Sequence, residues 1–226
     1  MIDLHFWPTP NGFKILIFLE ESGLDYELKP VHIGRGEQFA PEFLAISPNN
    51  KMPAIVDNAP ADGGAPISVF ESGAILNYLA EKADAFAGDH PRQRIQVQEW
   101  LFWQVGGLGP MAGQNHHFSA YAPETIPYAV ERYVNETARL YRVLNTRLEG
   151  REFLAGDYSV ADMAAYPWVR SWKKQQQQIS DHPALAAWKT RIETRPAVQR
   201  AYEIGKQVSD QPLMDDEAKR QLFGQR

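Results

Sequence analysis

The segment from Ser47 to Leu76 constrains the fold of this chain most, because strand, turn and helix signals follow one another closely along it. Apolar and branched residues predict two short strands and then a helix, at residues 53–57, 67–70 and 73–82. The connection between the strands is rich in glycine and proline, which favours a chain reversal and an antiparallel pair. A β-β-α unit is therefore expected, with Ser72 as the N-cap of its helix.

The residues before this unit predict a strand, a helix and a second strand, at residues 2–7, 13–22 and 26–33. The expected helix carries apolar residues at helical spacing and ends at Gly23, a common C-terminal signal. A β-α-β unit followed by a β-β-α unit is the thioredoxin-like arrangement. The sequence thus predicts an α/β thioredoxin-like N-terminal domain over residues 1–82.

The rest of the chain has helical periodicity. After a polar linker at 83–91, the pattern predicts an all-α C-terminal helical domain over 92–208 and a polar tail over 209–226. Ser159 followed by Asp162 fits a capping box at a helix start. Gln175–Gln178 is interpreted as a solvated helical segment. The expected helices cover residues 92–111 (kinked at its glycines), 126–148, 159–172, 183–194 and 197–208.

Composition narrows the function classes. Hydrophobic residues make up 44% and the net charge is −5 without a basic run, which argues against nucleic acid and anionic membranes as partners. No apolar run approaches the ~20 residues of a membrane span, and no secretory signal is visible, so a cytoplasmic location is expected. The chain has no cysteine, which excludes a thiolate nucleophile or a disulfide of its own.

A proline-rich turn at the first strand-to-helix junction is the most specific local signal. It reads Pro8-Thr9-Pro10-Asn11-Gly12, and taken alone it fits a turn with Asn11 as helix N-cap. Glu71-Ser72, taken alone, fits a capping pair. No metal site is expected, because the adjacent His116 and His117 would point in different directions on a helix.

Taken together, these segments resemble the nu-class glutathione transferases, bacterial proteins known for disulfide-bond reductase activity. The resemblance covers nearly the whole chain and departs only after about Trp168. The segments that carry it are residues 8–12, Asn49 with Lys51-Met52-Pro53, Phe70-Glu71-Ser72, residues 100–111 and residues 113–118.

The resemblance implies a site for glutathione as co-substrate, without a metal. It implies that Thr9 and Asn11 contact the thiol, and that Glu71 and Ser72 hold the γ-glutamyl end. It further implies that Gln38 contacts the glycine carboxylate of glutathione and that the Met52 backbone pairs with the cysteinyl part. It also implies that Pro53 is cis and that Arg132 makes a further contact with glutathione. Lys51 either attracts a carboxylate of glutathione or faces solvent in its loop.

The chemistry of these residue types fits glutathione. A free thiol with a pKa near ~8.5 is mostly protonated at neutral pH, and a hydroxyl donor, an amide donor and a helix N-terminus would lower that pKa. The γ-glutamyl group carries an ammonium and a carboxylate. Glu71 is suited to the first, and the Ser72 hydroxyl with the N–H groups that open the helix is suited to the second.

The favoured function is glutathione-dependent reduction of disulfides, in a site that also accepts oxidised glutathione. The resemblance further implies a homodimer. One alternative is a transferase or peroxidase that acts on electrophiles or organic hydroperoxides with the same activated thiolate. The other is a non-catalytic binding protein with the transferase fold. Retention of the whole set of glutathione residues argues against the second alternative.

Overall fold

The computed structural model describes residues 1–209 and 218, and it divides into two compact units. Unit 1 comprises Met1–Asp84 with the described residues from Pro196 onward, and unit 2 comprises Ala85–Arg195. The helix α9 (Pro196–Val208) belongs to unit 1 because it packs against α1 (Pro10–Ser22). The domain boundaries read from the sequence stay a prediction, and the expected tail lies, apart from Ser209 and Ala218, outside the described residues.

Unit 1 is built on a four-stranded mixed sheet with the strand order β2-β1-β3-β4. β1 is parallel to β2, and β3 is antiparallel to both β1 and β4, as the turn between β3 and β4 predicted. The α/β thioredoxin-like class is confirmed. The strand expected over 26–33 ends earlier, at a proline. The bounds of the strands are Ile2–Phe6 for β1, Tyr26–Pro30 for β2, Ala54–Asp57 for β3 and Ile67–Phe70 for β4.

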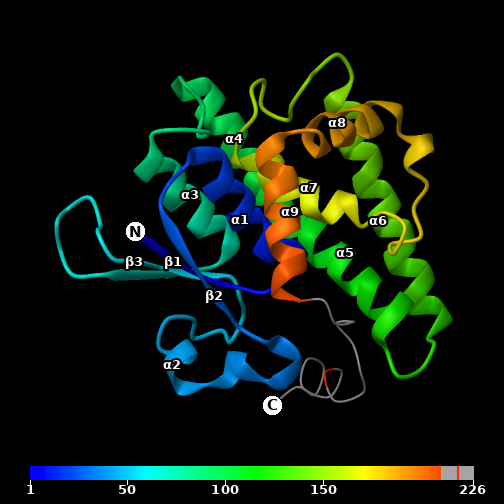
Figure 1. The fold of residues 1–226 in the computed structure, drawn as a ribbon. Coiled ribbons are helices and arrows are strands. Elements are labelled where there is room, and N and C mark those ends of the chain that lie inside the picture. The colour runs from blue at the N-terminus through cyan, green and yellow to red at the C-terminus, as the bar shows by residue number, and fades with distance from the viewer. Residues whose placement is uncertain (210–217, 219–226) are drawn as a thin grey trace. The chain divides into compact units, whose positions relative to one another are not determined.

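The two faces of this sheet carry different helices (Figure 1). On one face lie α1 and α3 (Ser72–Ala83), and Phe6 of β1 meets Phe13 of α1 with ring centroids 5.6 Å apart. On the other face lies α2 (Pro41–Leu44), whose Phe43 contacts His5 at 5.9 Å between ring centroids. Successive residues of a strand point to opposite faces, so β1 serves both layers.

Close packing joins α9 to α1. The ring of Tyr202 stacks on Phe13 with centroids 4.1 Å apart. A Cβ added at Gly205 would lie 2.5 Å from that phenylalanine ring, so the glycine allows the two helices to approach. A segment far along the chain therefore packs on α1 as an additional outer layer of unit 1.

Unit 2 is helical, which confirms the predicted class of the second half. Its helices are α4 (Pro91–Trp103), α5 (Gly109–His116), α6 (Pro127–Leu148), α7 (Val160–Arg170) and α8 (Pro183–Glu193). The kink expected within 92–111 is a π-helical turn at Gln104–Leu108, and a second π-helical turn follows α5 at His117–Tyr121.

The capping box at the start of α7 is present as predicted. Asp162 is fully buried, and its carboxylate accepts from the backbone N–H of Ser159 at 3.1 Å. It also accepts from the Leu154 N–H at 3.0 Å and from Trp188 Nε1 at 2.8 Å. One carboxylate therefore ties α7 to α8 and to the loop before the helix.

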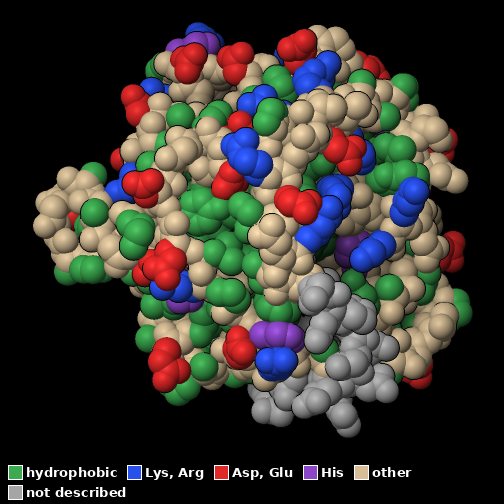
Figure 2. Space-filling model, in the orientation of Figure 1, with side chains coloured by type: hydrophobic (Ala, Val, Ile, Leu, Met, Phe, Trp, Pro, Cys, Tyr) green, Lys and Arg blue, Asp and Glu red, His purple; other side chains and the backbone are tan. Residues whose placement is uncertain are grey.

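The helices of the described part include none that is long and apolar enough to cross a bilayer. Figure 2 shows acidic and basic side chains interspersed on the face it displays, in keeping with the modest net charge of −5.

Candidate functional site

Several of the segments identified in the sequence leave the sheet at the same end of its strands, and this end is called the sheet edge below. His5 pairs with Ala54, and Ala54 pairs with Phe70, so the loop after β1, the loop before β3 and the residues after β4 begin side by side. The Val31 N–H donates to the Phe6 carbonyl at 2.9 Å, which starts the connection after β2 at the same edge. The predicted glutathione residues of unit 1 lie on these connections or in the short helices and first helical turns that they lead into: Thr9, Asn11, Gln38, Lys51, Met52, Pro53, Glu71 and Ser72.

Thr9 is the N-cap residue of α1. Its backbone is extended, and its Oγ1 accepts a hydrogen bond from the Gly12 N–H at 3.3 Å. This rules out the alternative that Asn11 caps the helix, since Asn11 lies inside the first turn. A hydroxyl that accepts can still donate, and the Thr9 hydroxyl donates to the Met52 sulfur at 3.9 Å. A thioether is a weak acceptor, so a thiolate would be a better partner for this proton.

The N-terminal end of α1 adds a favourable potential for an anion. Its first turn contains no acidic residue, and the free N–H groups and the helix dipole both favour negative charge there. A Cβ at Gly12 would lie 2.3 Å from the Trp7 carbonyl oxygen, so only glycine lets the first turn come this close to the preceding loop. The turn is thus suited to hold a thiolate beside Thr9.

The loop before β3 has the backbone that the resemblance implied, because the Met52–Pro53 peptide bond is cis. The Ser47 hydroxyl donates to the Lys51 carbonyl at 2.7 Å and braces this loop. Met52 is half-buried against an apolar cluster on the α2 face of the sheet, whereas the Lys51 side chain is exposed. The contacts of Lys51, Met52 and Pro53 with glutathione stay predictions.

Glu71 and Ser72 differ from expectation in one respect. Ser72 is the first residue of α3 and Glu71 stands at the N-cap position, so the prediction that Ser72 is the N-cap was wrong. Glu71 has a φ of 69° and a ψ of 115°, a conformation that costs a non-glycine residue roughly 1–3 kcal/mol. This backbone leaves the carboxylate exposed, where it accepts from Asn49 Nδ2 at 3.5 Å. An ammonium can approach it there.

Lys14 was missed by the sequence reasoning. It lies in α1 with only 2% of its surface exposed, and its Nζ donates to Ser72 Oγ at 3.1 Å. Burial lowers the pKa of the Lys14 ammonium to about 7, although the negative charge of Glu71 acts in the opposite direction. The signal that could have found it is the run Phe13–Leu19, which is apolar on all sides of a helix except at this lysine.

Two further predicted residues have distinct surroundings. Gln38 lies on the short 3₁₀ helix η2 (Glu37–Phe39), is 4% exposed, and its Oε1 has no hydrogen-bond partner among the described residues. A ligand group is one way to satisfy such an atom. Arg132 lies on α6 in unit 2, where it is exposed and lines a surface hollow with Tyr128 and Glu131. Its predicted contact with glutathione stays a prediction.

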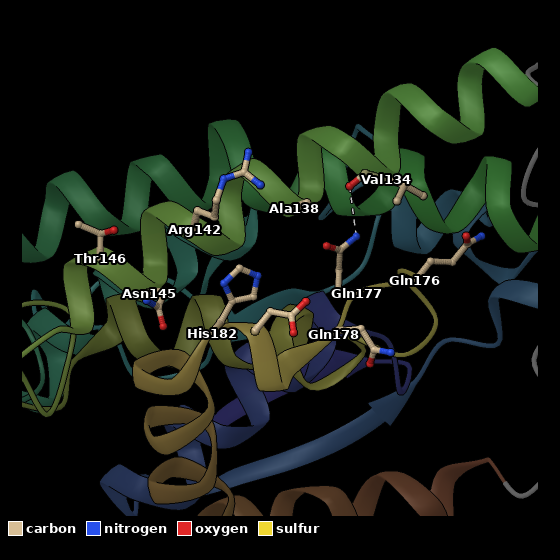
Figure 3. Close-up of a pocket in the computed structure, with 10 residues that line it drawn as sticks. Val134, Ala138, Arg142, Asn145, Thr146, Gln176, Gln177, Gln178 and His182 are labelled. Atoms are coloured by element: carbon tan, nitrogen blue, oxygen red, sulfur yellow. Dashed lines mark hydrogen bonds between the residues drawn. The ribbon is translucent and has the colours of Figure 1, made fainter.

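The glutamines at residues 176–178 line a second hollow in unit 2 (Figure 3). It has a volume of about 570 Å³ and includes Arg142, His182 and Gln176–Gln178 in its wall. The helix expected at 175–178 was wrong, since the segment is a turn and a loop. Gln175 and Gln177 are buried, whereas Gln176 and Gln178 are exposed as expected. The Gln177 amide donates to the Val134 carbonyl at 3.2 Å, which holds this segment against α6. None of the predicted glutathione residues lines this hollow.

Within the described residues, no three His, Cys, Asp or Glu side chains gather where they could hold a metal ion. The groups that the described residues bring together at this end of the sheet are hydrogen-bond donors, a helix N-terminus and the opposite charges of Lys14 and Glu71.

Comparison with known proteins agrees with this geometry. Residues 1–81 match the N-terminal domain of glutathione S-transferases, and residues 110–196 match the C-terminal domain. The disulfide-bond oxidoreductase YfcG of Escherichia coli is 58% identical over 214 residues, covering 93% of this chain and 100% of YfcG. The disulfide-bond oxidoreductase YghU of the same organism is 38% identical over 88% of this chain and 73% of YghU.

Solved structures show the same relationship. A glutathione transferase from Pseudomonas putida, with one glutathione disulfide bound per subunit, has a TM-score of 0.85 at 41% identity over 90% of this chain and 91% of that one. A family member from Pseudomonas fluorescens, with two glutathione bound, has a TM-score of 0.84 at 40% identity over 89% and 92%. This chain therefore belongs to the glutathione transferase family.

Proposed function

We propose that this protein is a glutathione-dependent disulfide-bond reductase. The observation that carries the proposal is the Thr9 hydroxyl, which stands at the N-terminus of α1 and, within the part of the chain that the structure describes, donates only to a weak thioether acceptor. A glutathione sulfur in this place would receive that proton and the potential of the helix end. Both favour the thiolate, which is the reactive form.

The reaction uses two molecules of glutathione. The thiolate of the first attacks one sulfur of the disulfide, forms a mixed disulfide and releases the other sulfur as a thiolate, which takes up a proton. A second glutathione thiolate attacks the glutathione sulfur of the mixed disulfide. It forms oxidised glutathione and releases the second product thiol. The disulfide gains two electrons, and both come from glutathione, because the chain contains no cysteine.

The relatives support this choice of reaction. YfcG and YghU are disulfide-bond oxidoreductases, and one of the similar solved structures holds a glutathione disulfide. In this proposal Thr9 and Asn11 serve the thiol, while Gln38, Lys51, Met52, Pro53, Glu71 and Ser72 bind the rest of the first glutathione. Arg132 helps to hold the second glutathione.

Kinetic assays with a dialkyl disulfide and with a chlorinated nitroaromatic test the proposal. We expect rapid turnover of the disulfide with stoichiometric formation of oxidised glutathione. Turnover of the aromatic alone would favour the conjugating transferase instead. Absence of both activities, with no retention on immobilised glutathione, would leave a binding protein of the transferase fold.

The proposal extends to assembly and location. We propose a homodimer, as the family resemblance implies, which sedimentation velocity would distinguish from a monomer by mass. We also propose a cytoplasmic location, because reduced glutathione is the electron source and the cytosol keeps its glutathione pool reduced. Cell fractionation tests this second point.

A further inference from the structure

Lys14 brings a positive charge into the interior of unit 1 at the start of α3. Burial of a charged group costs free energy unless it is paired and hydrogen-bonded, and the neighbouring helix positions in α1 are apolar. A methionine or leucine would therefore suit this position if packing were all that mattered. The Lys14 ammonium instead donates to Ser72 Oγ at 3.1 Å. Ser72 is one of the two residues predicted to bind the γ-glutamyl group.

We propose that Lys14 is a positioning residue for the γ-glutamyl carboxylate of glutathione, acting through the Ser72 hydroxyl and through its own charge. The inference rests on the proposed function, because it concerns the same glutathione site. Lys14 does not need to touch the ligand for this role.

The direction of the Lys14–Ser72 hydrogen bond carries the first step. A lysine ammonium has donors and no acceptor, so Ser72 Oγ must accept in this pair. The hydroxyl proton of Ser72 is then left for another acceptor. Ser72 opens α3, where backbone N–H groups are free and the helix dipole is positive. A carboxylate at this point would receive the hydroxyl proton and the N–H groups together.

Charge balance carries the second step. The γ-glutamyl end brings an ammonium and a carboxylate, and the protein offers the opposite pair in Glu71 and Lys14. Without Lys14, the carboxylates of Glu71 and of the ligand would lie close together with one negative charge uncompensated. The lysines and arginines of α3 and α9 pair elsewhere: Lys82 with Asp57, Arg200 with Glu20 and Lys206 with Glu203. Glu81 of α3 is exposed to solvent. By strand alternation, Asp3 and His5 of β1 point to the opposite face.

The same charge predicts a pH dependence. The pKa of Lys14 is about 7, lowered by burial and raised by Glu71. A bound carboxylate would raise this pKa further, so the ligand binds best when Lys14 is protonated. Affinity should therefore fall as the pH rises through the pKa of the free protein toward that of the complex.

Calorimetric titration with S-methylglutathione tests the proposal, since the blocked sulfur removes the titration of the thiol. Lys14→Met should weaken binding at least about tenfold, or about 1.4 kcal/mol, and should abolish the fall in affinity with pH. Lys14→Arg should restore binding without the pH dependence, because a guanidinium stays protonated. Lys82→Met, which removes another partly buried lysine of unit 1, should leave the dissociation constant unchanged.

Two ligand analogues separate positioning from general support of the fold. γ-Aminobutyryl-(S-methyl)cysteinylglycine lacks the carboxylate, and glutaryl-(S-methyl)cysteinylglycine lacks the ammonium. Lys14→Met should weaken binding of the glutaryl analogue only. If this variant does not fold, the wild-type protein decides by itself, because the glutaryl analogue should lose affinity with rising pH and the aminobutyryl analogue should not.

The failures are distinguishable. Equal losses for both analogues, or a wild-type affinity that does not change with pH, would overturn the role of Lys14 and leave the proposed function standing. If the wild-type protein did not bind S-methylglutathione at millimolar concentration, the proposed function would fail and this inference with it.

Discussion

Replacement of Thr9 by alanine should separate two effects of one hydroxyl. As N-cap of α1 it accepts from the Gly12 N–H at 3.3 Å, and loss of such a cap costs about 0.5–2 kcal/mol of stability. As a proposed donor to the thiolate it contributes a hydrogen bond to a charged group, worth about 1.5–3 kcal/mol. The second loss corresponds to about 10- to 150-fold in the rate of the chemical step. Glutathione affinity should change far less, because the other predicted contacts remain.

Three measurements on Thr9→Ala test this division. Denaturant unfolding reports the cap, the ultraviolet absorbance of bound thiolate against pH reports the thiol pKa, and steady-state kinetics report turnover. The thiol pKa should rise and turnover should fall in Thr9→Ala, while Thr9→Ser, which keeps the hydroxyl, should behave like the wild type. Unchanged turnover with a raised KM would refute the assignment, as would a serine variant as slow as the alanine variant.

Further outcomes follow from the same contacts. Asn11→Ala should also lower turnover more than affinity, as kinetics and calorimetry would show; the reverse pattern would remove Asn11 from the thiol site. Glu71→Ala should abolish useful glutathione affinity in calorimetric titration. The Glu71→Gly variant should be more stable than the Glu71→Ala variant by about 1 kcal/mol, because glycine accepts positive φ; equal melting temperatures of the two variants would contradict the backbone strain. Asp162→Ala should destabilise the protein by at least about 3 kcal/mol in denaturant unfolding, since the buried Leu154 N–H and Trp188 Nε1 lose their acceptor. If the protein is treated with an alkylating agent that is then removed, disulfide turnover should stay unchanged, because the chain has no cysteine. Oxidised glutathione should compete with reduced glutathione for binding. If oxidised glutathione does not bind at millimolar concentration, the two-glutathione mechanism is refuted.

The fold could be predicted largely because its signals are local. Alternation and turn residues identified the antiparallel pair of β3 and β4, and helical periodicity separated the two halves of the chain. The capping box at Ser159 was visible for the same reason, because both partners lie three residues apart. The N-cap of α1 could also have been predicted from the sequence. Pro10 suits the first helical position, which favours Thr9 over Asn11 as N-cap.

Buried polar groups were harder to predict, since their partners are distant in sequence. Gln175 was assigned to solvent, yet its side chain accepts from the Tyr141 hydroxyl at 2.7 Å and donates to the Trp168 carbonyl at 2.8 Å. A glutamine can satisfy two buried groups at once, and nothing in its local pattern reveals that they exist. Lys14 escaped notice for a similar reason, because its acceptor Ser72 lies on another helix.

Three residues of unit 1 adopt locally unfavourable arrangements, and all three lie at the sheet edge that carries the predicted glutathione site. Glu71 adopts a positive φ without being glycine, Lys14 buries a charge, and the Thr9 hydroxyl donates to a sulfur that accepts weakly. The strain at Glu71 is a property of its backbone, whereas the contacts of Lys14 and Thr9 would improve if a carboxylate and a thiolate were added beside them. Such conflicts tend to persist where function requires them. Glutathione carries both groups: it would give the Lys14 charge and the Thr9 proton better partners, and its ammonium at the Glu71 carboxylate would offset the backbone strain of that residue.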